Sequence, residues 1–487
     1  MRKNGMMKVV IVNKSDSTGG AAVVSRRLME ALRAEGVDAR MLVAEKLSDS
    51  PFVEVIASPM RLKTAFIADR LKIAFANGFN RKTLFQADAA AAGIDISRHP
   101  LVRDADAILI NWINQGVLSL KDIDRLARSG KRILWTMHDM WNFTGICHHA
   151  GICRRYLPPE YHHSSEKSPS AECNLAAGYS ASHPFIPCGE CPLLGKYARI
   201  HDLSFHTARR KKELYYQAGI TFVAVSNWLA ERARKSALLA GSDIRVIPNA
   251  FPMPDNLPLE KSVTGGVHLI FGAARLDDPI KDFPLLIESL GRFKELDPAL
   301  ADRSVITLFG DIKDATLLER IPIRCDYRGM IRSQKEIVDL YRKADIVIST
   351  SRYETLPGTL IEGQACGCWP IALDSGGQPD IITDGVTGSL LHLTKSDKSD
   401  NSANSDNSDN SNNSNNSNNS NNSNNSNNSN NSDQSAKADL FARAIIDSAS
   451  LLQSDPLIPA RLRQAVIDNF SAPAIARRYI AILDAEA

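Results

Sequence analysis

Residues 346–367 read IVISTSRYETLPGTLIEGQACG, and this stretch has the pattern of a strand, a loop and a helix. Residues 346–349 are predicted to form a buried strand, and Pro357 is suited to the first turn of the helix that follows. Glu354 then falls in the loop between strand and helix, and Glu362 falls early in the helix. A strand, a short loop and a helix form the unit from which parallel α/β sheets are built.

The same alternation of short apolar strands and helices runs along the chain on both sides of this stretch. Continuous apolar strands separated by helices are typical of a parallel sheet that is covered on both faces. The predicted strands fall into two series, which are Val9–Val12, Met41–Ala44, Ala107–Ile110, Ile133–Thr136, Phe222–Val225 and Arg245–Ile247, and then Leu269–Gly272, Val305–Phe309, Ile346–Ser349 and Pro370–Leu373.

The chain has 487 residues, which is too many for one hydrophobic core. A Pro-rich segment, FPMPDNLP at 251–258, separates the two series and is interpreted as a linker. We therefore expect two domains, each a doubly wound sheet. The expected ranges are 1–250 for the N-terminal domain, with a Cys-rich insertion at about 145–195, and 251–394 with 436–487 for the C-terminal domain.

Residues 395–435 are almost entirely Asn and Ser. Such a tract has very little apolar surface to bury, so we predict that it is disordered. Beyond it, residues 440–452, 460–469 and 473–483 are predicted to be helices. The tract is therefore expected to interrupt the second domain and not to end it.

Composition narrows the class of protein. Apolar residues make up 44% of the chain, as in ordinary globular proteins. The formal net charge of +3 argues neither for nor against a nucleic-acid partner, and we expect none. No stretch approaches the ~20 apolar residues that span a bilayer, and the first strand is too short for a signal peptide. We expect a cytoplasmic protein whose cysteines are thiols or metal ligands.

The segments around Glu354 and Glu362 resemble glycosyltransferase family 4, a group of retaining enzymes with the GT-B fold. The family's motif has two glutamates separated by seven residues, then a small-residue helix and a Gly-rich turn. Here the turn is DSGGQPD at 374–380, and DGVTG at 384–388 continues the pattern. The TLPG at 355–358 departs from the Gly-Phe-Gly run of many members. This difference affects the expected donor-sugar pocket and not the resemblance to the glycosyltransferase family.

The resemblance implies roles for four charged residues. Glu354 would contact the transferred sugar, and Glu362 would accept hydrogen bonds from the ribose hydroxyls. Arg275 and Lys281, in GAARLDDPIKD at 272–282, would hold the diphosphate. Fixed cations stabilise the charge on a departing diphosphate without a metal ion, and an arginine can hold a phosphate through two parallel hydrogen bonds.

Three residues of the first domain complete the expected site. Gly19 and Gly20 join the first strand to the first helix, where a close backbone turn and free N–H groups can receive a ligand. The family's glycine loop lies at the same place, so both are predicted to contact the donor. His138 follows the strand at 133–136, and the family places a histidine here near the reacting sugar. We expect His138 to position the reactants more than to transfer a proton.

Five of the eight cysteines lie within residues 147–191. Cys188 and Cys191 form a C-x₂-C knuckle, which suits tetrahedral zinc. Buried thiols or a redox-labile pair are the other interpretations. A catalytic metal is not expected. A second pair of zinc ligands would be Cys147 and Cys153, for which the alternatives are His148, His149 and Cys173.

The sequence thus predicts a metal-independent, retaining glycosyltransferase of the hexosyltransferase type, without a cofactor. It would move a sugar from a nucleotide-sugar donor to a hydroxyl of a glycan or a lipid-linked acceptor, in the biosynthesis of bacterial surface polysaccharides. Peripheral contact with the inner face of the membrane would follow from such an acceptor. The alternatives are a nucleotide-sugar epimerase of the same fold and a non-catalytic, zinc-stabilised carbohydrate-binding protein.

Overall fold

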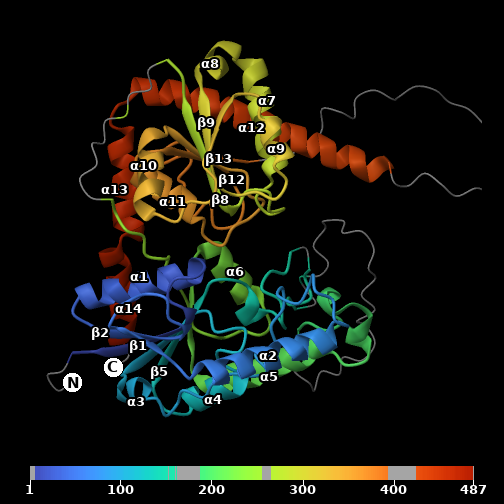
Figure 1. The fold of residues 1–487 in the computed structure, drawn as a ribbon, viewed down its shortest axis with the longest axis vertical. Helices are drawn as coiled ribbons and strands as arrows, with labels where there is room; N and C mark the ends of the chain where they lie inside the picture. Colours follow the sequence, from blue (N-terminus) through green and yellow to red (C-terminus); the bar gives the residue numbers. More distant parts are fainter. Residues whose placement is uncertain are drawn as a thin grey trace, which may run out of the picture. The chain divides into compact units, whose positions relative to one another are not determined.

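The computed structural model describes residues 6–151, 153–158, 161, 187–254, 261, 265–392 and 424–485. The chain divides into two compact units, which are Met1–Pro252 with Asn469–Ala487, and Met253–Asp468 (Figure 1). Each unit is built on one parallel sheet, which confirms the predicted α/β class. No helix within the described ranges is both long enough and apolar enough to cross a membrane.

The first unit has a seven-stranded sheet in the order β3-β2-β1-β4-β5-β6-β7. The strand order reverses between β1 and β4, which makes their carboxyl ends a topological switch point. The strands are β1 (Lys8–Ser15), β2 (Asp38–Glu45), β3 (Val53–Val55), β4 (Ala107–Ile110), β5 (Arg132–Met137), β6 (Thr221–Ala224) and β7 (Ile244–Val246). The helices are α1 (Gly20–Ala34), α2 (Pro59–Ala76), α3 (Pro100–Asp104), α4 (Leu120–Ala127), η1 (Trp141–Phe143), η3 (Pro192–Arg199), α5 (Leu203–Ala218), α6 (Asn227–Lys235) and α14 (Ala472–Ala485).

The second unit has a six-stranded sheet in the order β10-β9-β8-β11-β12-β13, and its switch point lies between β8 and β11. The strands are β8 (His268–Arg275), β9 (Val305–Asp311), β10 (Arg324–Tyr327), β11 (Ile346–Ser349), β12 (Trp369–Leu373) and β13 (Ser389–Leu391). The helices are α7 (Phe283–Leu296), α8 (Pro298–Arg303), α9 (Thr316–Glu319), α10 (Gln334–Lys343), α11 (Gly358–Ala365), α12 (Asn424–Ser454) and α13 (Ile458–Phe470).

The C-terminal helix belongs to a different unit from the one predicted. Residues 469–487 lie with the first unit, although the sequence assigns 436–487 as a whole to the second domain. Helix α14 packs against α1, and Ile475 and Tyr479 are buried in the first unit's core. The apolar face of α14 is what the sequence reveals, but the face alone does not say which sheet buries it.

The end of the Asn/Ser tract also differs from its prediction. Helix α12 begins at Asn424, so residues 424–435 are helical where disorder is predicted. Further along, α12 packs against α7 (Figure 1) and buries Ala438 and Phe441. A helix that is nucleated by packing extends at the gain of one hydrogen bond per residue, even through weak helix formers. The rest of the tract lies outside the described residues.

Candidate active site

The predicted donor residues of the second unit follow two neighbouring strands. Arg275 is the last residue of β8, and Lys281 comes six residues later. Glu354 follows β11, which pairs in parallel with β8. Ligands of doubly wound sheets bind at the carboxyl ends of the strands where the strand order reverses. The structure therefore places two cations and a carboxylate in the two loops that leave this switch point.

Lys281 and Glu354 are in direct contact. The ammonium of Lys281 donates to Oε1 of Glu354, and the same oxygen accepts a hydrogen bond of 3.0 Å from the hydroxyl of Ser351. The two charged side chains are 24% and 21% exposed, so a ligand can reach both. An ammonium can bind a phosphate, and a carboxylate can accept hydrogen bonds from sugar hydroxyls.

Two aspartates orient the guanidinium of Arg275. Its Nη2 donates to Asp278 at 3.1 Å, and its Nε lies 3.4 Å from a carboxylate oxygen of Asp277. Asp277 also accepts the backbone N–H of Lys313 at 3.1 Å, which connects it to the loop after β9. A guanidinium held in this way loses little further freedom when it binds an anion.

Residues that the sequence patterns did not single out fasten the two loops to each other. The hydroxyl of Thr350 donates to the carbonyl of Lys281 at 2.8 Å. Arg352 donates from Nε to Asp282 at 2.9 Å, and Asp282 has a left-handed backbone with φ of 52°. A non-glycine residue in this region is strained and is held by its surroundings. The only signal for Thr350, Arg352 and Asp282 in the sequence is that they lie next to the predicted donor residues.

The predicted Gly-rich turn supports the loop that carries Glu354. The N–H of Gly377 donates to the carbonyl of Glu354 at 2.7 Å. Gly376 has a φ of +64°, and a Cβ at this position would lie 2.5 Å from the Glu354 carbonyl oxygen. Glycine is therefore required at 376 both for the backbone angle and for the space.

Glu362 is the fifth residue of α11 and is partly exposed. Its neighbour Gly363 packs against β11 so closely that a Cβ there would lie 2.8 Å from the side chain of Val347. This close packing of helix on strand fixes the position of Glu362 relative to the switch point.

In the first unit, Gly19 is the N-cap of α1 and Gly20 is its first residue. Gly19 has a φ of +90°, which favours glycine. A Cβ added at either position would meet no atom within 4 Å. The space beside the first residues of α1 is therefore open. The contact of Gly19 and Gly20 with the donor stays a prediction.

His138 follows β5, and its Nε2 lies 2.8 Å from Oδ1 of Asn111, the residue directly after β4. The two side chains share one hydrogen bond, whose donor is set by the tautomer of the imidazole and the orientation of the amide. Burial lowers the pKa of His138 to about 4, although the charge of Asp139 opposes this. A neutral imidazole with one fixed hydrogen bond fits a positioning role.

Burial of neutral His138 makes stability depend on pH. Between the ordinary pKa of 6.5 and about 4, the unfolded chain binds a proton that the native chain does not. The contribution of this residue to stability is therefore lost as the pH falls through that window. We expect His138→Gln to flatten the decline of the melting temperature over this window, compared with the wild type. His201→Gln, at another exposed histidine, is the control. If the melting temperature of His138→Gln falls with pH as steeply as that of the wild type, then His138 does not have the lowered pKa described here.

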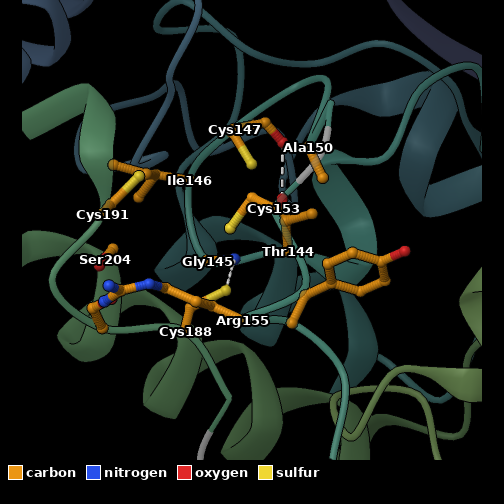
Figure 2. Close-up of a pocket in the computed structure, with 12 residues that line it drawn as sticks. Thr144, Gly145, Ile146, Cys147, Ala150, Cys153, Arg155, Cys188, Cys191 and Ser204 are labelled. Atoms are coloured by element: carbon orange, nitrogen blue, oxygen red, sulfur yellow. Dashed lines mark hydrogen bonds between the residues drawn. The ribbon is translucent and has the colours of Figure 1, made fainter. Parts of the chain in front are cut away.

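Four cysteines of the first unit line one small cavity, which is shown in Figure 2. They are the knuckle residues Cys188 and Cys191 together with Cys147 and Cys153. Burial raises the pKa of Cys147 to about 11 and that of Cys191 to about 12, so both are thiols at neutral pH. His148 and His149 do not line this cavity, and Cys173 lies outside the described residues.

The second unit's site coincides with a known sequence family. Residues 272–420 match the family described as Glycosyl transferases group 1. We call residues 272–420 the group 1 region. Arg275, Lys281, Glu354 and Glu362 all lie inside this group 1 region, whereas Gly19, Gly20 and His138 lie before it.

Curated relatives of the chain resemble it over short segments. A D-inositol 3-phosphate glycosyltransferase of Streptomyces bingchenggensis is 30% identical over 123 residues, which are 23% of this chain and 27% of that protein. The protein of the same name in Mycolicibacterium gilvum is 39% identical over 66 residues, 14% of this chain and 15% of that protein. The chain thus spans about a quarter or less of the length of these relatives.

Solved structures resemble the chain over its whole length. HepE of Anabaena, crystallised with UDP, has a TM-score of 0.51 at 14% identity, over 98% of this chain and 99% of that chain. WaaG, a glycosyltransferase involved in lipopolysaccharide biosynthesis, has a TM-score of 0.53 at 12% identity, over 98% of this chain and 100% of that chain. At these identities the likeness shows the fold alone. The predicted GT-B fold is confirmed, and it contains the group 1 region in its second unit.

Proposed function

We propose that the protein is a retaining glycosyltransferase that uses a nucleotide-sugar donor. The proposal rests mainly on the contact of Lys281 with Glu354. This contact and Arg275 lie at the switch point of the second unit. Two cations and a carboxylate at this place match what a diphosphate with an attached sugar needs from its binding site. The alignment of this region with group 1 enzymes supports the same assignment.

Each residue of the proposed site has a distinct role in the reaction. Arg275 and Lys281 hold the diphosphate and stabilise the charge that grows on it as its bond to the anomeric carbon breaks. Glu354 accepts a hydrogen bond from the transferred sugar, and Glu362 binds the ribose. The acceptor hydroxyl attacks from the side on which the diphosphate leaves, and its proton passes to the departing phosphate oxygen. His138 orients the reactants.

The donor and the acceptor are proposed by chemical class. A uridine diphosphate hexose is the first donor to test, because HepE has been crystallised with UDP and with UDP-glucose. The acceptor is a hydroxyl of a glycan or of a lipid-linked glycan, in the assembly of a surface polysaccharide. No metal ion is needed at the reacting bond, since Arg275 and Lys281 supply the positive charge.

One assay separates this proposal from its alternatives. The protein is incubated with a panel of nucleotide sugars and candidate acceptors, and the products are identified by mass spectrometry and NMR. Release of a nucleoside diphosphate with a glycosylated acceptor supports a transferase. Conversion of the donor to its epimer identifies an epimerase. Binding without any product from the whole panel identifies a carbohydrate-binding protein and rejects the transferase assignment.

Glu362→Ala is expected to weaken binding of the nucleoside diphosphate. The ribose hydroxyls would lose a charged acceptor that contributes about 1.5–3 kcal/mol, which corresponds to a rise in Kd of roughly tenfold to a hundredfold. Titration calorimetry measures the change. Glu336→Ala, at an exposed position of α10, is the control. An unchanged Kd for Glu362→Ala removes this residue from the donor site.

Helix α2 offers a surface for peripheral contact with a membrane. Met60, Ile67, Leu71 and Phe75 recur at helical spacing and are all exposed, Met60 by 80% and Phe75 by 65%. Basic residues flank this stripe, and their side chains are exposed as well: Arg61, Lys63 and Lys72. Exposed apolar side chains with cations beside them can bind to an anionic lipid surface. We propose that α2 docks on the inner face of the membrane, where a lipid-linked acceptor is found.

Binding to vesicles tests the membrane contact. The protein should sediment with vesicles that contain anionic lipid and much less with purely zwitterionic ones. The double variant Leu71→Ser/Phe75→Ser should lose most of this binding, whereas Leu457→Ser, at an exposed apolar residue of the other unit, should keep it. Equal sedimentation of all three proteins would show that α2 is not the contact.

A further inference from the structure

The four cysteines come from two separate segments that fold against each other. Cys147 and Cys153 lie in the stretch after η1, and Cys188 and Cys191 lie just before η3. All four border one cavity of about 20 Å³, and their side chains surround it in Figure 2. A volume of this size admits one water-sized occupant. It fits a single ion and is too small for a cluster of several metal atoms.

The knuckle between Cys188 and Cys191 has a strained backbone. Cys188 has a φ of 65° and Glu190 has a φ of 44°, a region that non-glycine residues rarely adopt. Hydrogen bonds hold this shape: the N–H of Cys188 donates to the carbonyl of Arg155 at 2.7 Å, and Arg155 Nη1 donates to the carbonyl of Gly189 at 2.8 Å. Strain that is held by its surroundings marks functional positions.

Groups around the cavity suit a negatively charged sulfur cluster. The backbone N–H of Gly145 donates to Sγ of Cys188 at 3.1 Å, an outer-shell contact of the kind that orients metal-bound ligands. Arg155 lines the cavity. The fully buried ammonium of Lys211 donates to the carbonyl of Thr144, another lining residue, at 3.1 Å. One divalent ion and four thiolates carry two net negative charges, and basic side chains at and behind the cavity wall suit an anionic centre of this kind.

We propose that Cys147, Cys153, Cys188 and Cys191 bind one structural zinc ion. Four thiolates match the closed tetrahedral shell of structural zinc sites and leave no open position for catalysis. Each thiol gives up its proton to solvent when it ligates the metal. As the side chains are placed, no group of three or more Cys, His, Asp or Glu within the described ranges is already arranged to hold a metal. Binding therefore requires the sulfur atoms to rotate inward.

The ion would tie the loop after η1 to the segment before α5. The loop after η1 contacts Asp139, the neighbour of His138: Asp139 accepts a hydrogen bond of 2.8 Å from His148, which is next to Cys147. Zinc is thus expected to stabilise the part of the first unit that carries the predicted positioning histidine.

Metal analysis of the full chain tests the site. Untagged protein, purified in reducing buffer without chelator, should contain about one zinc per chain by elemental mass spectrometry. Replacement of zinc by cobalt should give the absorption spectrum of tetrahedral thiolate coordination. The double variant Cys188→Ser/Cys191→Ser should lose the metal, and Cys325→Ser, a partly buried cysteine of the other unit, should retain it.

The outcomes are separable from those of the transferase assay. Wild-type protein without metal in which all four thiols react with a thiol reagent overturns the proposal. Iron in place of zinc, or zinc that persists in the double variant, overturns it as well. If the double variant does not fold, the zinc content and the cobalt spectrum of the wild type decide alone.

Discussion

Arg275→Ala and Lys281→Ala are each expected to lower kcat by ~10²–10³, the usual loss when one donor to a developing anion is removed. Both cations lie at the switch point, and both serve the diphosphate as its charge grows. An interaction that is stronger in the transition state than in the ground state affects kcat more than KM. Steady-state kinetics with the donor found in the screen measures both constants.

The control for Lys281 is another lysine that pairs with a carboxylate. Lys335 contacts Asp339 at 2.9 Å, but it is 87% exposed on α10. Lys335→Ala should leave kcat unchanged. Added Mg²⁺ should not rescue either cation variant, and the wild type should keep its activity during a short assay with EDTA. A kcat within about threefold of wild type for Arg275→Ala or Lys281→Ala would show that the residue does not serve the diphosphate.

Gly376→Ala is expected to abolish most activity and to lower the melting temperature. The new Cβ would lie 2.5 Å from the carbonyl oxygen of Glu354, so the loop that presents Glu354 to the ligand must move. Forcing an atom into a packed site costs about 1–3 kcal/mol, beyond the ~1 kcal/mol of a left-handed alanine.

Gly385→Ala separates the clash from the backbone strain. Gly385 is also left-handed, with φ of +70°, but a Cβ there would meet nothing within 4 Å. This variant should lose only the smaller amount of stability and should keep its turnover. Equal effects of the two substitutions on kcat would show that the contact with Glu354 is not what matters at Gly376.

The strands that were predicted and those that were missed differ in burial. The strands β4 and β11 are buried throughout, and their short apolar runs can be recognised in the sequence. The missed strands β3, β10 and β13 all lie at sheet edges. The sequence of β10, Arg-Cys-Asp-Tyr, has partly exposed side chains and no apolar run to detect.

The sequence predicts those site residues that are charged and that also lie near the end of a predicted strand. Arg275 ends one strand, Lys281 and Glu354 lie in the loops that follow two neighbouring strands, and the strand order brings these loops together. Their supports were not predictable in the same way. The hydrogen bonds of Thr350 to the carbonyl of Lys281 and of Asn111 to His138 join segments that are distant in the sequence. Such contacts depend on tertiary packing, which no local pattern encodes.

A crystal structure of the chain with a nucleoside diphosphate tests the central claim most directly. We expect the phosphates to lie within hydrogen-bonding distance of Arg275 and Lys281, at the carboxyl ends of β8 and β11, and the ribose hydroxyls to reach Glu362. Lys281 should then share its hydrogen bonds between Glu354 and the phosphate. A nucleotide bound with its phosphates away from both cations would show that Arg275 and Lys281 do not form the diphosphate site.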